Sequence, residues 1–418
     1  MSTEDRRSAA EPRPVDFRRL LKNVELLVRD IESGEETASA IHRLADRIVG
    51  KFRDELGMSG GRLYRREGDM YRLVATFADA RPFTSEVRVP VAYAPVELVL
   101  ADGVVYMDRD DPRLDREIER HLGVERFAAI EVGEGDFLLS FDIAPGQDGA
   151  TVLYSLGVLR HAINQKLRQE RMQEVFEQAR KIQSSILPRR VPSYGDFDMA
   201  GATRPVETVG GDFYDYIPIT DKILGLAIAD VSGHGLPAAL QVRDVYMGLR
   251  MGMARDFKIV RTVERLNSII HKSTLTSRFV SVFYGELELN GVFIYVNAGH
   301  PPPFHVAGDG TVRWLEEGGA VLGPIANATY ERGFVRLQPG DLLVFYTDGI
   351  IEATNGALEL GGEEFGEERL VAAATAVRDL PAREIVDEIF AAVERFAEGT
   401  PPEDDRTVVV VRYPAVPA

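Results

Sequence analysis

Aspartates in this sequence recur at the ends of apolar runs, several of them beside glycine. Six share this setting: Asp212, Asp215, Asp230, Asp348, Asp404 and Asp405. In three of the segments a predicted buried strand delivers a carboxylate to a sheet edge, where the adjacent glycine lets the backbone approach a ligand closely. Carboxylates buried together are costly unless a cation neutralises them. Hard oxygen ligands of this kind select Mg²⁺ or Mn²⁺ rather than zinc.

Each acidic segment also has a simpler interpretation. An Asp-Gly pair after a strand is more often a turn than a ligand site, because both residues favour turn geometry. The pair Asp404 and Asp405 is equally compatible with a solvated loop. Residues 210–213 (GGDF) match part of the diguanylate cyclase signature, but Tyr214 stands where that signature has a glutamate. The joint occurrence of the segments, in order along the chain, favours a metal centre.

The composition excludes several kinds of chemistry. The chain has no cysteine, which rules out disulfides, thiolate zinc sites, iron–sulfur clusters and phosphatases that attack through cysteine. The formal net charge of −17 argues against nonspecific nucleic-acid binding. No apolar run approaches the roughly 20 residues that a membrane span needs, and the first residues do not resemble a signal peptide. We therefore expect a soluble, cytoplasmic protein with a protein or small-molecule partner.

The length of 418 residues predicts two domains. Residues 1–15 are predicted to be a disordered tail. Residues 16–151 combine two helical patterns, at 24–31 and 41–56, with strands at 62–65, 71–77, 87–91, 104–107 and, closing the sheet, 137–141. This layout resembles the GAF family of small sensory domains. Residues 189–418 alternate strands with helices at 237–255, 259–274 and 382–396, which indicates an α+β sandwich.

Residues 152–188 predict one long helix that ends at Pro188. Apolar residues recur along it at steps of three and four, with one step of five that shifts the register: Leu156, Leu159, Ile163, Leu167, Met172, Val175, Ala179, Ile182 and Ile186. Such a seam favours a parallel coiled-coil linker that forms a homodimer. The alternative is an amphipathic helix that packs on its own domain.

The C-terminal part resembles the metal-dependent, type 2C-like (PPM) serine/threonine phosphatases, in the bacterial branch of stage II sporulation protein E and the sigma-factor regulators. Seven ordered stretches carry the resemblance: 179–188 (ARKIQSSILP), 209–215 (VGGDFYD), 229–235 (ADVSGHG), 297–303 (NAGHPPP), 346–349 (YTDG), 365–370 (FGEERL) and 404–407 (DDRT). The resemblance covers about residues 178–414. It implies an αββα sandwich for this domain.

The resemblance implies a set of metal ligands and catalytic residues. Asp230 would bridge two cations, Mn²⁺ or Mg²⁺, with the backbone carbonyl of Val231 as a further ligand. Asp348 and Asp404 would complete the first site. Asp212 would act mainly through water on the second cation or on a third one. Water activated by the two cations would then attack the phosphorus directly, without a phosphoenzyme.

Five further residues have weaker roles under this resemblance. Asp215 and Asp405 are candidates for orienting the ligands. Arg204 is a guess for a phosphate contact, because the arginine usual in eukaryotic members has no clear counterpart. His300 could protonate the leaving oxygen or could hold the proline-rich turn after it, and His234 could serve only to shape a glycine-rich turn.

The implied function is a protein serine/threonine phosphatase that acts on a phosphorylated partner, by family analogy an anti-anti-sigma factor. The front domain would regulate it through the linker, with no nucleic-acid or membrane partner. Two alternatives stay open: a catalytically silent, partner-binding signalling protein of the same fold, and, with less support, a nucleotide cyclase.

Overall fold

The computed structural model describes residues 37–80, 86–233, 235–253, 258–273, 279–356 and 362–415. The chain divides into two compact units, Met1–Glu174 and Val175–Ala418, each of which is described by itself. The predicted tail at 1–15 and the helical pattern at 24–31 lie outside the described residues. Among the helices of the described ranges, none combines the length and the apolar character that crossing a membrane requires.

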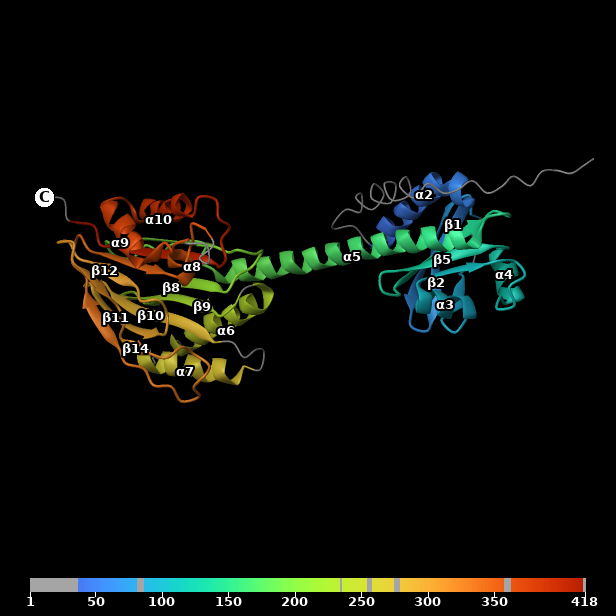
Figure 1. The fold of residues 1–418 in the computed structure, drawn as a ribbon. Helices are drawn as coiled ribbons and strands as arrows, with labels where there is room; N and C mark the ends of the chain where they lie inside the picture. Colours follow the sequence, from blue (N-terminus) through green and yellow to red (C-terminus); the bar gives the residue numbers. More distant parts are fainter. Residues whose placement is uncertain are drawn as a thin grey trace, which may run out of the picture. The chain divides into compact units, whose positions relative to one another are not determined.

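The first unit is built on one antiparallel sheet with strand order β3-β2-β1-β6-β5-β4 (Figure 1). Its strands are β1 (Met58–Glu67), β2 (Met70–Ala78), β3 (Arg88–Pro90), β4 (Val104–Met107), β5 (Phe127–Val132) and β6 (Phe137–Ile143). Its helices are α2 (Thr37–Leu56), α3 (Ala94–Asp102), α4 (Arg116–Leu122) and the first part of α5 (Gly149–Ile186). Helices α2 and α5 share an apolar core with one sheet face, whereas α3 and α4 pack on the other.

The predicted strands 62–65 and 71–77 are confirmed, because they lie in β1 and β2, which pair directly through Glu67 and Met70. The prediction that residues 137–141 close the sheet is wrong, since β6 lies between β1 and β5. Both faces of β6 are covered by helices, so almost all of its residues are buried. Helices α3 and α4 and strand β5 were not predicted. The apolar residues of α3 and β5 form short runs without a helical period, which the sequence pattern leaves ambiguous. The GAF-like identity of this unit stays a prediction.

Helix α5 begins at Gly149 and continues through Ile186. Leu156, Leu159 and Ile163 are buried in the core of the first unit, so this part of the predicted seam packs on its own domain. In contrast, Met172 and Ile182 are 57% and 53% exposed, with Val175 between them at 43%. Any seam between two copies of the chain is therefore confined to the second half of the predicted one. The predicted domain boundaries at 151 and 188 stay predictions.

The second unit contains two sheets. One has the order β14-β11-β10-β9-β8, with β15 also paired to β11, and the other has the order β13-β12-β16-β17-β7. The strands are β7 (Asp198–Arg204), β8 (Asp212–Thr220), β9 (Ile223–Val231), β10 (Val280–Glu288), β11 (Val292–Ala298), β12 (Phe304–Val306), β13 (Val312–Trp314), β14 (Gly318–Gly319), β15 (Gly333–Arg336), β16 (Leu342–Tyr346) and β17 (Arg406–Arg412).

Helices cover the outer faces of both sheets in the second unit (Figure 1). They are α6 (Gly235–Met253), α7 (Ile259–Lys272), α8 (Asp348–Ile351), α9 (Gly366–Ala376) and α10 (Ala382–Ala397). Helices α6 and α7 pack on the sheet of β8–β11, and α9 and α10 on the other sheet. The inner faces meet in an aromatic core that includes Phe283, Phe293 and Phe345. The layers are helices, sheet, sheet and helices, which confirms the predicted sandwich.

Candidate metal centre

The acidic segments of the second unit lie at the ends of strands that pair with one another. Asp212 begins β8 and is the cross-strand partner of Asp230 in β9. In the other sheet β16 and β17 are neighbours. Asp348 follows β16 as the first residue of α8, and Asp404 lies just before β17. The topology thus brings two acidic segments from each sheet to the strand ends.

A pair of threonines joins the two sheets at Asp212. The hydroxyl of Thr347 donates to Asp212 Oδ2 over 2.8 Å, and the hydroxyl of Thr407 donates to the same oxygen over 2.6 Å. Asp212 is buried, and burial raises its pKa well above the usual value for aspartate. The charge of Asp230 acts in the same direction, whereas the two threonine hydroxyls favour the ionised form. The hydroxyls therefore orient this carboxyl group and offset part of the effect of burial on its pKa.

Asp230, Asp348 and Asp404 lie within electrostatic range of one another. Burial, and then the charges of Asp348 and Asp404, raise the pKa of Asp230 to about 8. Burial and the neighbouring Asp404 likewise raise the pKa of Asp348. Glu352, one turn beyond Asp348, adds to the same negative field, and its own pKa is raised by burial and by Asp348. These are carboxyl groups whose ionised forms a nearby cation would stabilise.

The carboxylates are near one another without forming a closed ligand shell. Within the ranges that the structure describes, no group of three or more His, Asp or Glu side chains is spaced to hold a metal ion. Like charges repel, so a cation is needed to draw such side chains into one coordination sphere. The available donors are carboxylate and carbonyl oxygens, which fit a hard divalent cation such as Mg²⁺ or Mn²⁺.

Glycine is required where the backbones at this site approach one another. A Cβ atom on Gly211 would lie 2.6 Å from the carbonyl oxygen of Val231 and 3.0 Å from that of Gly233. A Cβ atom on Gly349 would lie 2.1 Å from the carbonyl oxygen of Asp405. The first contact places the Val231 carbonyl, a predicted ligand, against the segment that carries Asp212.

We expect Gly211→Ala to lower the unfolding free energy by about 1–3 kcal/mol, because backbone atoms cannot move aside as a flexible side chain can. The phosphatase activity that the family resemblance implies should fall with it, per folded molecule, since Val231 and Asp230 would shift. Gly157→Ala is the matched control, because a Cβ there meets nothing within 4 Å. Thermal unfolding and hydrolysis of para-nitrophenyl phosphate measure the two effects. Equal activity in both variants would contradict this role of Gly211.

Asp405 and Gln183 hold the glycine segment in place. Asp405 accepts hydrogen bonds from the backbone amides of Val206 and Gly211, over 2.8 and 2.6 Å. Gln183, near the end of α5, exchanges two hydrogen bonds with the backbone of Gly210, over 2.6 and 3.2 Å. Asp405 is therefore a positioning residue, and the C-terminal end of α5 contacts the segment that leads into Asp212.

Two other candidates lie away from the carboxylates. Asp215 belongs to the opposite face of β8 from Asp212 and forms a 2.7 Å ion pair with Arg250 of α6. Its role is structural, because strand residues three apart point to opposite faces. Arg204 pairs with Glu394 and lies 4.1 Å from the centre of the Phe390 ring, both on α10. The guess that Arg204 contacts phosphate is therefore not supported.

His300 is buried between two hydrogen-bond partners. Its Nε2 donates to the carbonyl oxygen of Tyr346 over 3.1 Å, which leaves Nδ1 to accept from the hydroxyl of Ser281 over 2.9 Å. Burial lowers its pKa to about 3. A histidine that stays neutral and fully bonded is a poor general acid near neutral pH, so the structure disfavours the proton-donating role for His300. His234 lies outside the described residues.

Sequence reasoning missed four residues that the structure assigns to this site: Thr347, Thr407, Gln183 and Glu352. Three of them lie inside the stretches that carry the family resemblance. Those stretches mark where the residues are in the sequence, but not what their side chains contact. Hydroxyl and amide groups have no preference for metal sites on their own. Their function follows from contacts that join distant segments.

Taken together, a helix–sheet–sheet–helix sandwich with buried aspartates at the strand ends is typical of metal-dependent protein phosphatases. Residues 220–414 match the family described as stage II sporulation protein E. The C-terminal half of the chain therefore holds a phosphatase domain of this type.

Curated relatives support the same assignment. Phosphoserine phosphatase RsbU of Bacillus subtilis is 29% identical over 210 residues, 49% of this chain and 62% of RsbU. Protein IcfG of Synechocystis is 26% identical over 324 residues, 68% of this chain and 49% of IcfG. The chain thus spans about half to three fifths of the length of these relatives. The solved SiaA-PP2C domain of Pseudomonas aeruginosa, with 19% identity and a TM-score of 0.53, covers 59% of this chain and 98% of its own, and it shares the fold.

Proposed function

We propose that this chain is a metal-dependent phosphatase that hydrolyses phosphoserine or phosphothreonine on a partner protein. The observation that carries the proposal is the shared negative field of Asp230, Asp348 and Asp404, beside Asp212 on the strand paired with β9. Buried carboxylates gathered at the rim of a rigid sandwich cost stability. Such a cost is expected where function requires it.

Two divalent cations, Mn²⁺ or Mg²⁺, would be held by Asp230, Asp348, Asp404 and the carbonyl of Val231, with Asp212 acting through water. When bound, they would supply an activated water and neutralise charge on the phosphoryl group. The protein's own contribution is positioning. Thr347 and Thr407 fix Asp212, and the two sheets hold the carboxylates at their edges.

The substrate class follows from the relatives and from the charge. RsbU is named a phosphoserine phosphatase, and the family resemblance points to an anti-anti-sigma factor as the phosphorylated partner. The −17 charge of the chain disfavours a nucleic-acid substrate.

The direct test is hydrolysis of para-nitrophenyl phosphate and of a phosphoserine peptide by the full chain with Mn²⁺. We expect turnover of both, lost on adding EDTA and restored by excess Mn²⁺. Hydrolysis that EDTA leaves unchanged would contradict the proposal, and so would the absence of hydrolysis with both Mn²⁺ and Mg²⁺.

A second candidate is a catalytically silent protein of the same fold that binds its partner and relays a signal. The presence of Asp230, Asp348 and Asp404 argues against it. The two candidates differ in one result. A silent protein would bind the phosphorylated partner without releasing phosphate.

For regulation, we propose that the front unit acts through α5 on the metal centre in a homodimer. The contact that supports this is the pair of hydrogen bonds between Gln183 and Gly210. A shift of the helix end would move the segment that leads into Asp212. The exposed apolar residues Met172, Val175 and Ile182 supply the surface for a second copy.

We expect the double change Met172→Glu and Ile182→Glu to convert a dimer to a monomer, because it places like charges in the seam of a parallel pair. Ser184→Glu is the control, since this exposed residue lies on the same helix but off the seam. Light scattering after size exclusion gives the mass of each. A monomeric wild type, or an unchanged dimer in the double variant, would refute the dimer.

A further inference from the structure

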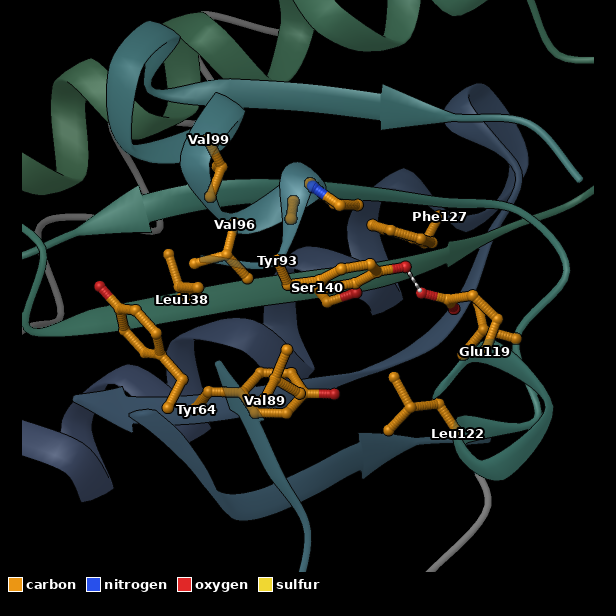
Figure 2. Close-up of a pocket in the computed structure, with 14 residues that line it drawn as sticks. Tyr64, Val89, Tyr93, Val96, Val99, Glu119, Leu122, Phe127, Leu138 and Ser140 are labelled. Carbon is orange, nitrogen blue, oxygen red and sulfur yellow. Dashed lines mark hydrogen bonds between the residues drawn. The ribbon is translucent and has the colours of Figure 1, made fainter. Parts of the chain in front are cut away.

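The first unit contains a cavity between the second face of its sheet and helices α3 and α4. Figure 2 shows the side chains that line it. The cavity has a volume of about 50 Å³, counted as the space open to the centre of a water molecule. Its walls are mainly aromatic and aliphatic, with contributions from Tyr64, Tyr71, Val96, Val99, Phe127 and Leu138. Mostly apolar walls with a few polar groups are typical of small-molecule sites.

One acidic side chain, Glu119 of α4, reaches this apolar cavity. Its Oε1 accepts a 2.6 Å hydrogen bond from the Tyr93 hydroxyl (Figure 2). That hydroxyl in turn accepts from the backbone amide of Asp115 over 3.2 Å, which fixes its orientation. Glu119 is only 8% exposed, yet its Oε2 has no hydrogen-bond partner among the described residues. A buried carboxyl oxygen without a partner is costly, so its retention in an apolar wall needs an explanation.

We propose that this cavity binds a compact, flat, largely apolar ring compound whose N–H group donates to Glu119 Oε2. The aromatic and aliphatic walls favour a ring over a charged or extended polar molecule. The unpartnered carboxyl oxygen of Glu119 then selects, among such rings, those with a donor. A ligand donor would offset the desolvation of Oε2, which no group of the residues that the structure describes does.

Two neighbouring groups partly offset the effect of burial on Glu119. Burial raises the pKa of its carboxyl group, whereas the Tyr93 hydroxyl and the charge of Arg62 act in the opposite direction. Arg62 is held by a 2.5 Å ion pair with Asp142 and a hydrogen bond to the Leu122 carbonyl. It is thus fixed beside the α4 helix.

The test uses indole and benzofuran, two rings of matched shape. Benzofuran has an ether oxygen in place of the N–H group of indole. Isothermal titration of the full chain should show indole binding at least about tenfold more tightly than benzofuran, because a hydrogen bond to a carboxylate is strong. Glu119→Gln keeps the acceptor for Tyr93 but presents an N–H group to the cavity. This variant should lose the preference for indole and gain affinity for benzofuran.

Three results would overturn the proposal. They are no binding of indole to the wild type, equal affinity of the wild type for both rings, and an unchanged preference in Glu119→Gln. The wild-type comparison needs no variant, so it stands even if Glu119→Gln is unstable. A second variant, Ala129→Leu, fills the cavity from β5 and should weaken both rings together.

Discussion

Replacing Asp230 with asparagine should lower the rate of para-nitrophenyl phosphate hydrolysis by about 10³-fold with saturating Mn²⁺, because the shared ligand of the two cations would be lost. The fold should persist. Asparagine keeps the shape of the side chain. It also removes an ionisable group whose charged form the negative charges of Asp348 and Asp404 disfavour. We therefore expect the metal-free variant to be at least as stable as the wild type.

Asp215→Asn is the matched control for this experiment. It makes the same chemical change in the neighbouring strand, at a carboxylate that pairs with Arg250 instead of facing the candidate centre. We expect it to lower the unfolding free energy by about 1–3 kcal/mol while leaving the rate per folded molecule nearly unchanged. Equal rates in wild type and Asp230→Asn, or equal loss in both variants, would defeat the catalytic assignment.

The second large effect concerns stability and pH in the presence of EDTA. Asp230 has a pKa of about 8 in the folded chain against 3.8 for an unperturbed aspartate. For an acid whose pKa is raised, the folded state favours the neutral form, so stability is greatest below pH 3.8 and falls until the pH passes about 8. At 1.36 kcal/mol per pKa unit, the loss between pH 5 and pH 8 reaches about 4 kcal/mol.

Metal should reverse this trend. A cation competes with the proton for the same carboxylates, so Mn²⁺ should raise the melting temperature more at pH 8 than at pH 5. Asp230→Asn should flatten the pH dependence in EDTA and remove most of the Mn²⁺ effect. Differential scanning calorimetry at the two pH values measures both. A Mn²⁺ shift of the same size in wild type and variant would show that the cation binds elsewhere.

The sequence predicted those parts of the fold whose pattern is local and periodic. The strands predicted at 62–65 and 71–77 and the paired helices α6 and α7 follow hydrophobic periodicity, and the structure contains them. Leu156 and Ile163 were predicted to lie in a seam between two copies of the chain, but they pack in the core of the first unit. The same heptad pattern suits both kinds of packing. The central place of β6 depends on pairing between distant strands, which periodicity does not encode.

For the candidate centre, the order of the motifs along the chain identifies the aspartates. It does not identify the residues that hold those aspartates in position. Asp212 and Asp215 lie three residues apart and look equivalent in sequence, yet only Asp212 meets the threonines of the other sheet. His300 looked like a possible acid until its full burial and two hydrogen bonds were known. Burial and cross-sheet contacts determine these roles, and both arise from tertiary packing.

The most direct test of the central claim is anomalous diffraction at the manganese edge from crystals of the full chain grown with Mn²⁺. We predict two neighbouring manganese peaks, both contacted by the carboxylate of Asp230, with Asp348 and Asp404 on one of them. Manganese found only at other carboxylates, with the side chains of Asp230, Asp348 and Asp404 directed to separate places, would contradict the account.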